Sequence, residues 1–279
     1  MNKNPVASFL LPDEFRRPPL VRMLHEGRLV GEASRHAVRG LSGARTRTPY
    51  AGSAPVRDAD PVLLVPGFMA GDYTLAGLSR QLRREGHRTY RAGIPVANMG
   101  CTLDTAEMIE SRLEAIVARR EQRVQIVGHS LGGMLARGIA ARRPDLVSGI
   151  VTMGSPVLAP GAHHRSLTMF VLGLVAMSKV GVSGVMNETC VGGECALESF
   201  QESQVPLPSD VSFTAIYSRN DGIVDWRACL DPAATHVEVR ASHIGMAVDP
   251  RVSDEVLSAL RTHREGAAAA ASSLRVATA

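Results

Sequence analysis

A glycine-rich hexapeptide, Gly-His-Ser-Leu-Gly-Gly at positions 128–133, joins two segments with different hydrophobic patterns. The segment before it (123–127) forms a short apolar run typical of a buried strand. The segment after it has helical spacing and ends at Pro144. A strand that turns at once into a helix needs a tight turn, and the glycines let the neighbouring backbones approach closely. The sequence therefore predicts a strand–turn–helix unit with Ser130 projecting from its turn.

Short apolar runs and amphipathic segments alternate along most of the chain. This alternation indicates a mostly parallel central sheet with helices on both faces, an α/β fold. Functional residues are then expected beyond the carboxyl ends of the strands. Strands, some continuing into loops, are predicted at 61–68, 87–94, 123–130, 147–156, 211–224 and 235–246, and helices at 72–85, 105–120, 131–144 and 253–263.

The pattern divides the chain into a main domain at 61–265 and two flanking parts. Residues 1–60 read as an N-terminal extension that is partly helical near 18–38, followed by a loop at 46–55. Residues 266–279 form an Ala/Ser-rich tail that we expect to be disordered.

Residues 160–208 interrupt the alternation with an apolar stretch that is too short and too broken for a membrane span. We interpret this insertion as a helical lid whose apolar underside faces a greasy substrate. The alternative is an ordinary buried pair of helices.

Charge and composition bear on the class of binding partner and on the cellular location. The net charge of +4 comes largely from arginines in the first 60 residues. A basic arm of this kind suits nucleic acid or an anionic membrane, but the plainer reading is a solvated stretch. The chain is also poor in aromatic residues, which argues against nucleic-acid binding. The first 20 residues have no apolar run long enough for a secretory signal, so we expect a cytoplasmic protein.

The four cysteines are expected to be reduced thiols, although a disulfide from Cys190 or Cys195 to Cys229 is an alternative. No second ligand pair follows Cys190 and Cys195 at zinc-finger spacing. No phosphate-binding loop or dinucleotide fingerprint is present in the sequence either. We therefore expect neither a metal nor a cofactor.

Ser130 needs a general base, and the base needs an orienting acid, because a serine hydroxyl alone is a poor nucleophile at neutral pH. Asp221 follows the strand near 211–217, and His243 follows the last predicted strand. These two are the candidate acid and base, with Asp225 as a rival for the acid. The other histidines are weaker candidates for the base: His129 lies beside the serine, His236 within a strand pattern, and His163 and His164 in the insertion.

An oxyanion would require two backbone N–H donors. Leu131, directly after the serine, is one candidate, and Phe68, in the loop after the first strand, is the other. The side chains of Phe68 and Met69 are expected to line an acyl pocket, or else to belong to the core. His129 is expected to have a structural role, with substrate contact as an additional possibility.

These motifs resemble the α/β-hydrolase superfamily, and within it bacterial lipases and esterases. The resemblance covers about residues 60–262 and rests on 66–68, 128–133, 217–224 and 241–246. One departure is Pro66-Gly67, where many lipases have His-Gly.

The resemblance implies hydrolysis of small-molecule or lipid esters through an acyl-enzyme, without a cofactor and with possible transient contact with a lipid surface. Acyl transfer and thioester hydrolysis use the same residues, and a non-catalytic binding protein is a further alternative. The oligomeric state is left open.

Overall fold

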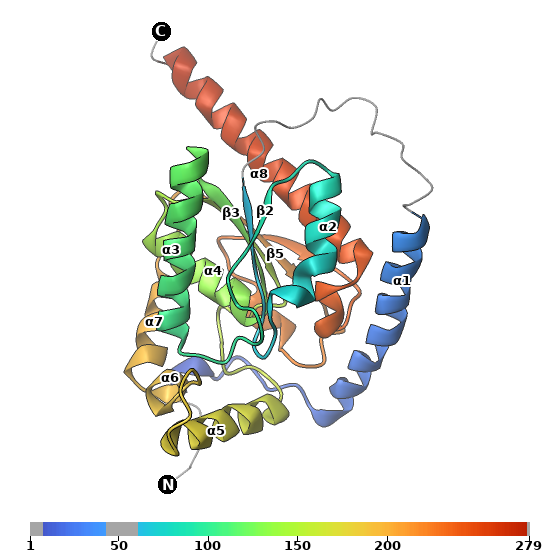
Figure 1. Cartoon of the computed structure of the whole chain (residues 1–279), viewed down its shortest axis with the longest axis vertical. Helices are drawn as coiled ribbons and strands as arrows, with labels where there is room; N and C mark the ends of the chain where they lie inside the picture. The colour runs from blue at the N-terminus through green and yellow to red at the C-terminus, as the bar shows by residue number, and fades with distance from the viewer. Residues whose placement is uncertain (1–7, 43–60, 278–279) are drawn as a thin grey trace.

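The computed structural model describes residues 8–42 and 61–277, and a six-stranded sheet lies at its centre (Figure 1). The strand order is β2-β1-β3-β4-β5-β6, and every pairing between these strands is parallel. The predicted α/β fold with a parallel sheet is therefore confirmed. The strands are β1 (Val62–Val65), β2 (Thr89–Arg91), β3 (Val124–His129), β4 (Val147–Met153), β5 (Ser212–Tyr217) and β6 (Thr235–Glu238).

Helices cover both faces of the sheet. On one face lie α3 (Thr102–Arg120) and α4 (Leu131–Arg142), and on the other lie α2 (Ala76–Arg84) and α8 (Pro250–Ala277). Alternate side chains of β3 pack in two hydrophobic cores on opposite faces of the sheet. Ile126 packs in the α3/α4 core and Val127 in the α2/α8 core. Because each strand is covered on both sides, its sequence reads as a continuous apolar run.

The insertion between β4 and β5 is helical. It contains α5 (Arg165–Lys179), α6 (Glu188–Gly192) and α7 (Glu194–Gln204). Of these, α7 packs against α3 and α4, while α5 and α6 lie at the carboxyl-terminal end of the sheet (Figure 1). No helix of the described segments is long and apolar enough to cross a membrane.

The described part of the N-terminal extension contains three short elements: η1 (Ser8–Leu10), η2 (Leu20–Arg28) and α1 (Leu29–Ser42). Both η2 and α1 contact η5 (Ile244–Ala247), and α1 also contacts α8. The loop predicted at 46–55 lies outside the described residues.

The C-terminal tail differs from the prediction. We expected the last helix to end near His263 and residues 266–279 to be disordered, but α8 continues to Ala277. The reason is the run of alanines at 267–271, because alanine has the highest helix propensity of all residues. In Figure 1 this last part of α8 extends away from the body of the molecule.

Candidate active site

Ser130 occupies a strained turn between β3 and α4. Its backbone has φ 51° and ψ −119°, a combination that residues with a side chain rarely adopt. The flanking glycines make the turn possible, because a Cβ on Gly128 would overlap the backbone of Gly132, and one on Gly132 would overlap the carbonyl of Val65. The serine hydroxyl therefore stands clear of the sheet, at the first turn of a helix.

His243 bridges Ser130 and Asp221. Its Nε2 lies 3.0 Å from the Ser130 hydroxyl oxygen, and its Nδ1 lies 2.6 Å from Asp221 Oδ2. The other carboxylate oxygen of Asp221 accepts hydrogen bonds from the backbone N–H groups of Ile223 and Val224. Because both carboxylate oxygens of Asp221 have hydrogen-bond partners, its side chain is held in one orientation. Asp221 in turn fixes the orientation of the His243 imidazole. The three side chains singled out in the sequence thus form one continuous hydrogen-bonded chain.

The environment of His243 favours its protonated form. Burial acts to lower the pKa of the imidazole, but the charge and hydrogen bond of Asp221 and the charge of Glu26 outweigh it, and the pKa is raised. An imidazole in this setting accepts a proton readily, as a general base must.

The rival residues have other partners. Asp225 caps the short helix η4 (Trp226–Cys229) and accepts hydrogen bonds from the backbone N–H groups of Arg16 and Arg227. His236 on β6 is bonded to the carbonyl of Asp231, and His164 caps α5. Among the described residues, none of these three hydrogen-bonds to Ser130.

His129 supports the loop that carries His243. Its Nε2 lies 2.9 Å from the His243 carbonyl oxygen, so the ring donates a hydrogen bond to the loop that carries His243. Burial and the nearby charge of His243 lower its pKa to about 4, which keeps it neutral. It is buried and is not among the residues that line the cavity at Ser130, which fits the expected structural role, and its contact with a substrate stays a prediction.

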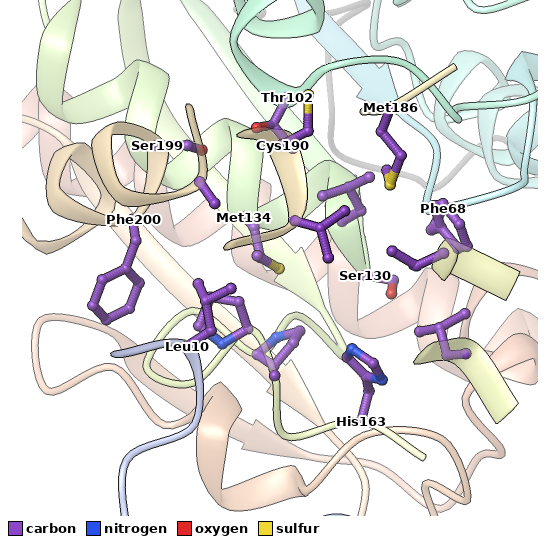
Figure 2. Close-up of a pocket in the computed structure, with 18 of the residues that line it drawn as sticks. Leu10, Phe68, Thr102, Ser130, Met134, His163, Met186, Cys190, Ser199 and Phe200 are labelled. Atoms are coloured by element: carbon purple, nitrogen blue, oxygen red, sulfur yellow. The ribbon is translucent and has the colours of Figure 1, made fainter. Parts of the chain in front are cut away.

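A largely apolar cavity opens at Ser130 (Figure 2). The insertion supplies much of its wall through all three of its helices, and the N-terminal extension contributes Leu10. His163 also lines the cavity, and burial lowers its pKa to about 4, so it presents a neutral ring. The apolar wall includes Leu10, Phe68, Leu131, Met134, Leu167, Val171, Met186, Val191, Phe200 and Val224.

The two candidate oxyanion donors flank the serine. Phe68 and Leu131 both line the cavity beside Ser130. Leu131 is the first residue of α4, where a backbone N–H has no acceptor within its own helix. The loop that carries Phe68 lies against the serine turn, since a Cβ on Gly67 would come within 3.1 Å of Ser130 Cβ. Met69 differs from expectation: it is 42% exposed and does not line the cavity.

Two glutamates of the N-terminal extension hold the loops that carry Asp221 and His243. Glu26 accepts hydrogen bonds from the backbone N–H groups of Gly222, His243 and Ile244, at 3.0, 2.9 and 3.1 Å. Glu32 is fully buried and accepts from the N–H and hydroxyl of Ser242. Sequence reasoning missed both residues, because a glutamate in a basic extension looks like an ordinary solvated charge.

Comparison with known proteins agrees with this architecture. The family model described as "alpha/beta hydrolase fold" matches residues 60–178. The mature form of the Bacillus licheniformis lipase BlEst2 superposes with a TM-score of 0.59 at 14% identity, covering 75% of this chain and 94% of that one. A structure from the study of the metagenome-derived lipolytic enzymes LipS and LipT gives a TM-score of 0.51 at 15% identity, covering 74% and 94%.

Two curated relatives are triacylglycerol lipases. The protein of Burkholderia plantarii is 27% identical over 246 residues, which is 77% of this chain and 66% of the relative. The protein of Vibrio cholerae serotype O1 is 32% identical over 113 residues, 38% of this chain and 33% of the relative. This chain therefore matches less than two thirds of the length of either relative.

The chain therefore has the α/β-hydrolase fold, and residues 60–178 match the family model of that description. Its sequence is similar to those of the two triacylglycerol lipases.

Proposed function

We propose that the protein is a serine hydrolase that cleaves carboxylic esters through an acyl-enzyme. The observation that carries the proposal is the position of His243, with one ring nitrogen 3.0 Å from Ser130 and the other 2.6 Å from Asp221. A serine, a histidine and a carboxylate in this order of contact form the machinery of nucleophilic acyl transfer.

The first half of the proposed reaction forms the acyl-enzyme. His243 takes the proton of Ser130 as the hydroxyl oxygen attacks the ester carbonyl, and Asp221 stabilises the imidazolium that results. The tetrahedral oxyanion is received by the backbone N–H groups of Phe68 and Leu131, each contributing roughly 3 kcal/mol of transition-state stabilisation. His243 then gives its proton to the leaving alcohol, and the acyl group stays on Ser130.

In the second half, water attacks the acyl-enzyme. His243 takes a proton from that water, a second oxyanion forms in the same place, and the carboxylic acid leaves as the proton returns to Ser130.

The cavity indicates an apolar acyl group. Its wall is lined mainly by aliphatic and aromatic side chains, so burying a hydrocarbon chain there contributes about 0.8 kcal/mol for each methylene. The insertion α5–α7 acts as the lid of this cavity in the proposal, because all three of its helices contribute to the wall.

A substrate presented at a lipid surface fits the outer face of the insertion. Met169, Phe170 and Val180 are 67%, 56% and 80% exposed on or directly after α5, at the end of the sheet where Ser130 lies. Apolar side chains grouped on one exposed helix favour contact with an apolar surface.

The test is hydrolysis of p-nitrophenyl esters, from acetate to palmitate, by the wild type and by Ser130→Ala in parallel. We expect the wild-type rate to rise with acyl length and the variant to lose at least about a thousandfold. A folded wild type that hydrolyses no ester, or a variant that keeps wild-type rates, would contradict the proposal.

Acyl transfer to an alcohol, or thioester hydrolysis, would use the same acyl-enzyme. The apolar wall around Ser130 is the feature that favours transfer, because it disfavours water near the acyl group. Adding a medium-chain alcohol to the assay separates these reactions: formation of a new ester at the expense of free acid would indicate a transferase.

A further inference from the structure

Three cysteine thiols meet where the helical insertion joins the body of the protein. Cys101 directly precedes α3, Cys190 lies in α6, and Cys195 lies in α7. Their sulfur atoms all lie within 4.8 Å of one another. None of the three forms a disulfide. The sequence did not suggest this group, because Cys101 is distant in the chain and the pair at 190 and 195 seemed to lack further ligands.

The three thiols lie in a partly enclosed place. Cys190 is buried, and Cys101 and Cys195 are half-buried. Cys101 lies at the N-terminal end of the 19-residue helix α3, and the positive end of a helix dipole favours a negatively charged sulfur.

Polar side chains also fix the other two sulfurs. Cys190 Sγ lies 3.3 Å from Asn187 Oδ1, and Cys195 Sγ lies 3.3 Å from the hydroxyl of Thr189. Asn187 itself is held by the backbone N–H groups of Thr189 and Cys190. These contacts fix where the two sulfurs lie while the thiols are protonated, and the bond from the Cys190 thiol to Asn187 Oδ1 is given up when the thiol proton leaves.

We propose that Cys101, Cys190 and Cys195 form a binding site for a thiophilic divalent cation of the Zn²⁺ type. Three thiolates suit Zn²⁺, which prefers sulfur and nitrogen ligands in a tetrahedral arrangement and accepts an external fourth ligand. Thiolates also select against Mg²⁺ and Ca²⁺, which require oxygen ligands.

The position of the site suits a structural role for the cation. Cys190 and its neighbour Val191 line the cavity at Ser130, and so does Thr102, the residue after Cys101 (Figure 2 labels Thr102 and Cys190). The cation would therefore tie α6 and α7 to the start of α3 and fix that wall of the cavity. This inference does not depend on which reaction Ser130 performs.

The experiment uses the full-length protein, reduced and stripped with a chelator, then titrated with Zn²⁺ and separately with Co²⁺ as a spectroscopic probe. We expect one equivalent of Zn²⁺ to bind with release of protons. Co²⁺ should give a thiolate charge-transfer band and the visible absorption of a tetrahedral ion. Zn²⁺ should also raise the Tm of the wild type.

Serine variants assign the ligands. Cys101→Ser, Cys190→Ser and Cys195→Ser should each lose the cobalt charge-transfer intensity and the Zn²⁺-dependent rise in Tm. The matched control is Cys229→Ser, because Cys229 is a buried free thiol that does not belong to the group, and it should bind like the wild type. Reduced, folded wild type that binds no stoichiometric Zn²⁺ would overturn the proposal, as would binding that survives both Cys101→Ser and Cys195→Ser.

Discussion

The carboxylate of Glu26 accepts a hydrogen bond from the backbone N–H of His243 at 2.9 Å, and the two residues are 217 positions apart in the chain. The same carboxylate accepts from Gly222, the residue after Asp221. One side chain of the N-terminal extension therefore holds both the loop of the candidate acid and the loop of the candidate base. It also contributes to the raised pKa of His243.

Replacing Glu26 with glutamine should lower kcat/KM and move its pH profile. Because the charge-assisted hydrogen bonds to Glu26 are lost, we expect the plateau value of kcat/KM to fall on the order of tenfold. A base must be neutral, so activity rises with pH through the pKa of His243. Removing the negative charge of Glu26 lowers that pKa, and the acid limb of the profile should shift to lower pH.

Labelling of Ser130 by a fluorophosphonate, followed against pH, gives the same readout without any ester substrate. Glu14→Gln is the matched control, because Glu14 is an exposed carboxylate of the same extension. An unchanged acid limb in Glu26→Gln, with labelling of the wild type intact, would mean that Glu26 does not act on His243. Absence of wild-type labelling would instead count against the serine mechanism.

The strained backbone of Ser130 predicts a gain in stability when the side chain is removed completely. At φ 51° and ψ −119°, glycine is far less restricted than serine or alanine. Ser130→Gly should therefore be more stable to urea than Ser130→Ala by about 1 kcal/mol, although both lose activity. Equal midpoints and slopes for the two variants would show that the turn stores no strain.

Four buried or half-buried histidines with lowered pKa values predict that stability falls as the pH is lowered. His87, His129, His163 and His263 have pKa values lowered to about 4, mainly by burial. Their contribution is complete above the unfolded-state pKa of about 6.5 and is lost progressively as the pH falls towards 4. Urea unfolding at several pH values should show the free energy of unfolding decreasing through this window. The free energy of unfolding of His129→Asn should decrease less steeply than that of the wild type as the pH falls. An identical slope for the two proteins would contradict the lowered pKa of His129.

Because apolar side chains on α5 are exposed, we expect a charged substitution there to lower the rate of hydrolysis selectively on aggregated substrates. Phe170→Asp should reduce the rate on emulsified long-chain esters several-fold, since burying a Phe side chain contributes about 1.5–3 kcal/mol. Its rate on a soluble short-chain ester should not change. Met108→Asp, at an exposed position on α3, is the control for surface charge. A parallel loss on both kinds of ester would point to a folding defect instead of surface contact.

Much of the architecture could be predicted because its signals are local. Apolar runs such as 123–127 and the glycines around Ser130 fix strands and the turn through short-range sterics. The order in which Asp221 and His243 follow their strands was sufficient to anticipate that they would approach Ser130. Their catalytic roles stay a prediction that the assays above test.

The remaining features depend on contacts that no local pattern encodes. Glu26 and Cys101 gain their partners only when distant segments fold together, and each alone looks like a surface charge or an isolated thiol. Met69 does not line the cavity at Ser130 although it directly follows Phe68, because neighbours along the chain can face in different directions. The length of α8 was missed because the alanine run was interpreted by its low complexity instead of its helix propensity.

The clamp formed by Glu26 and Glu32 joins segments that are made at different times during synthesis. The residues that it holds, Gly222 and Ser242 to Ile244, lie 196 to 218 positions further along the chain. Contacts of such sequence separation form late in folding. A nascent chain can therefore pair its first strands before the loops of Asp221 and His243 are held in place beside Ser130.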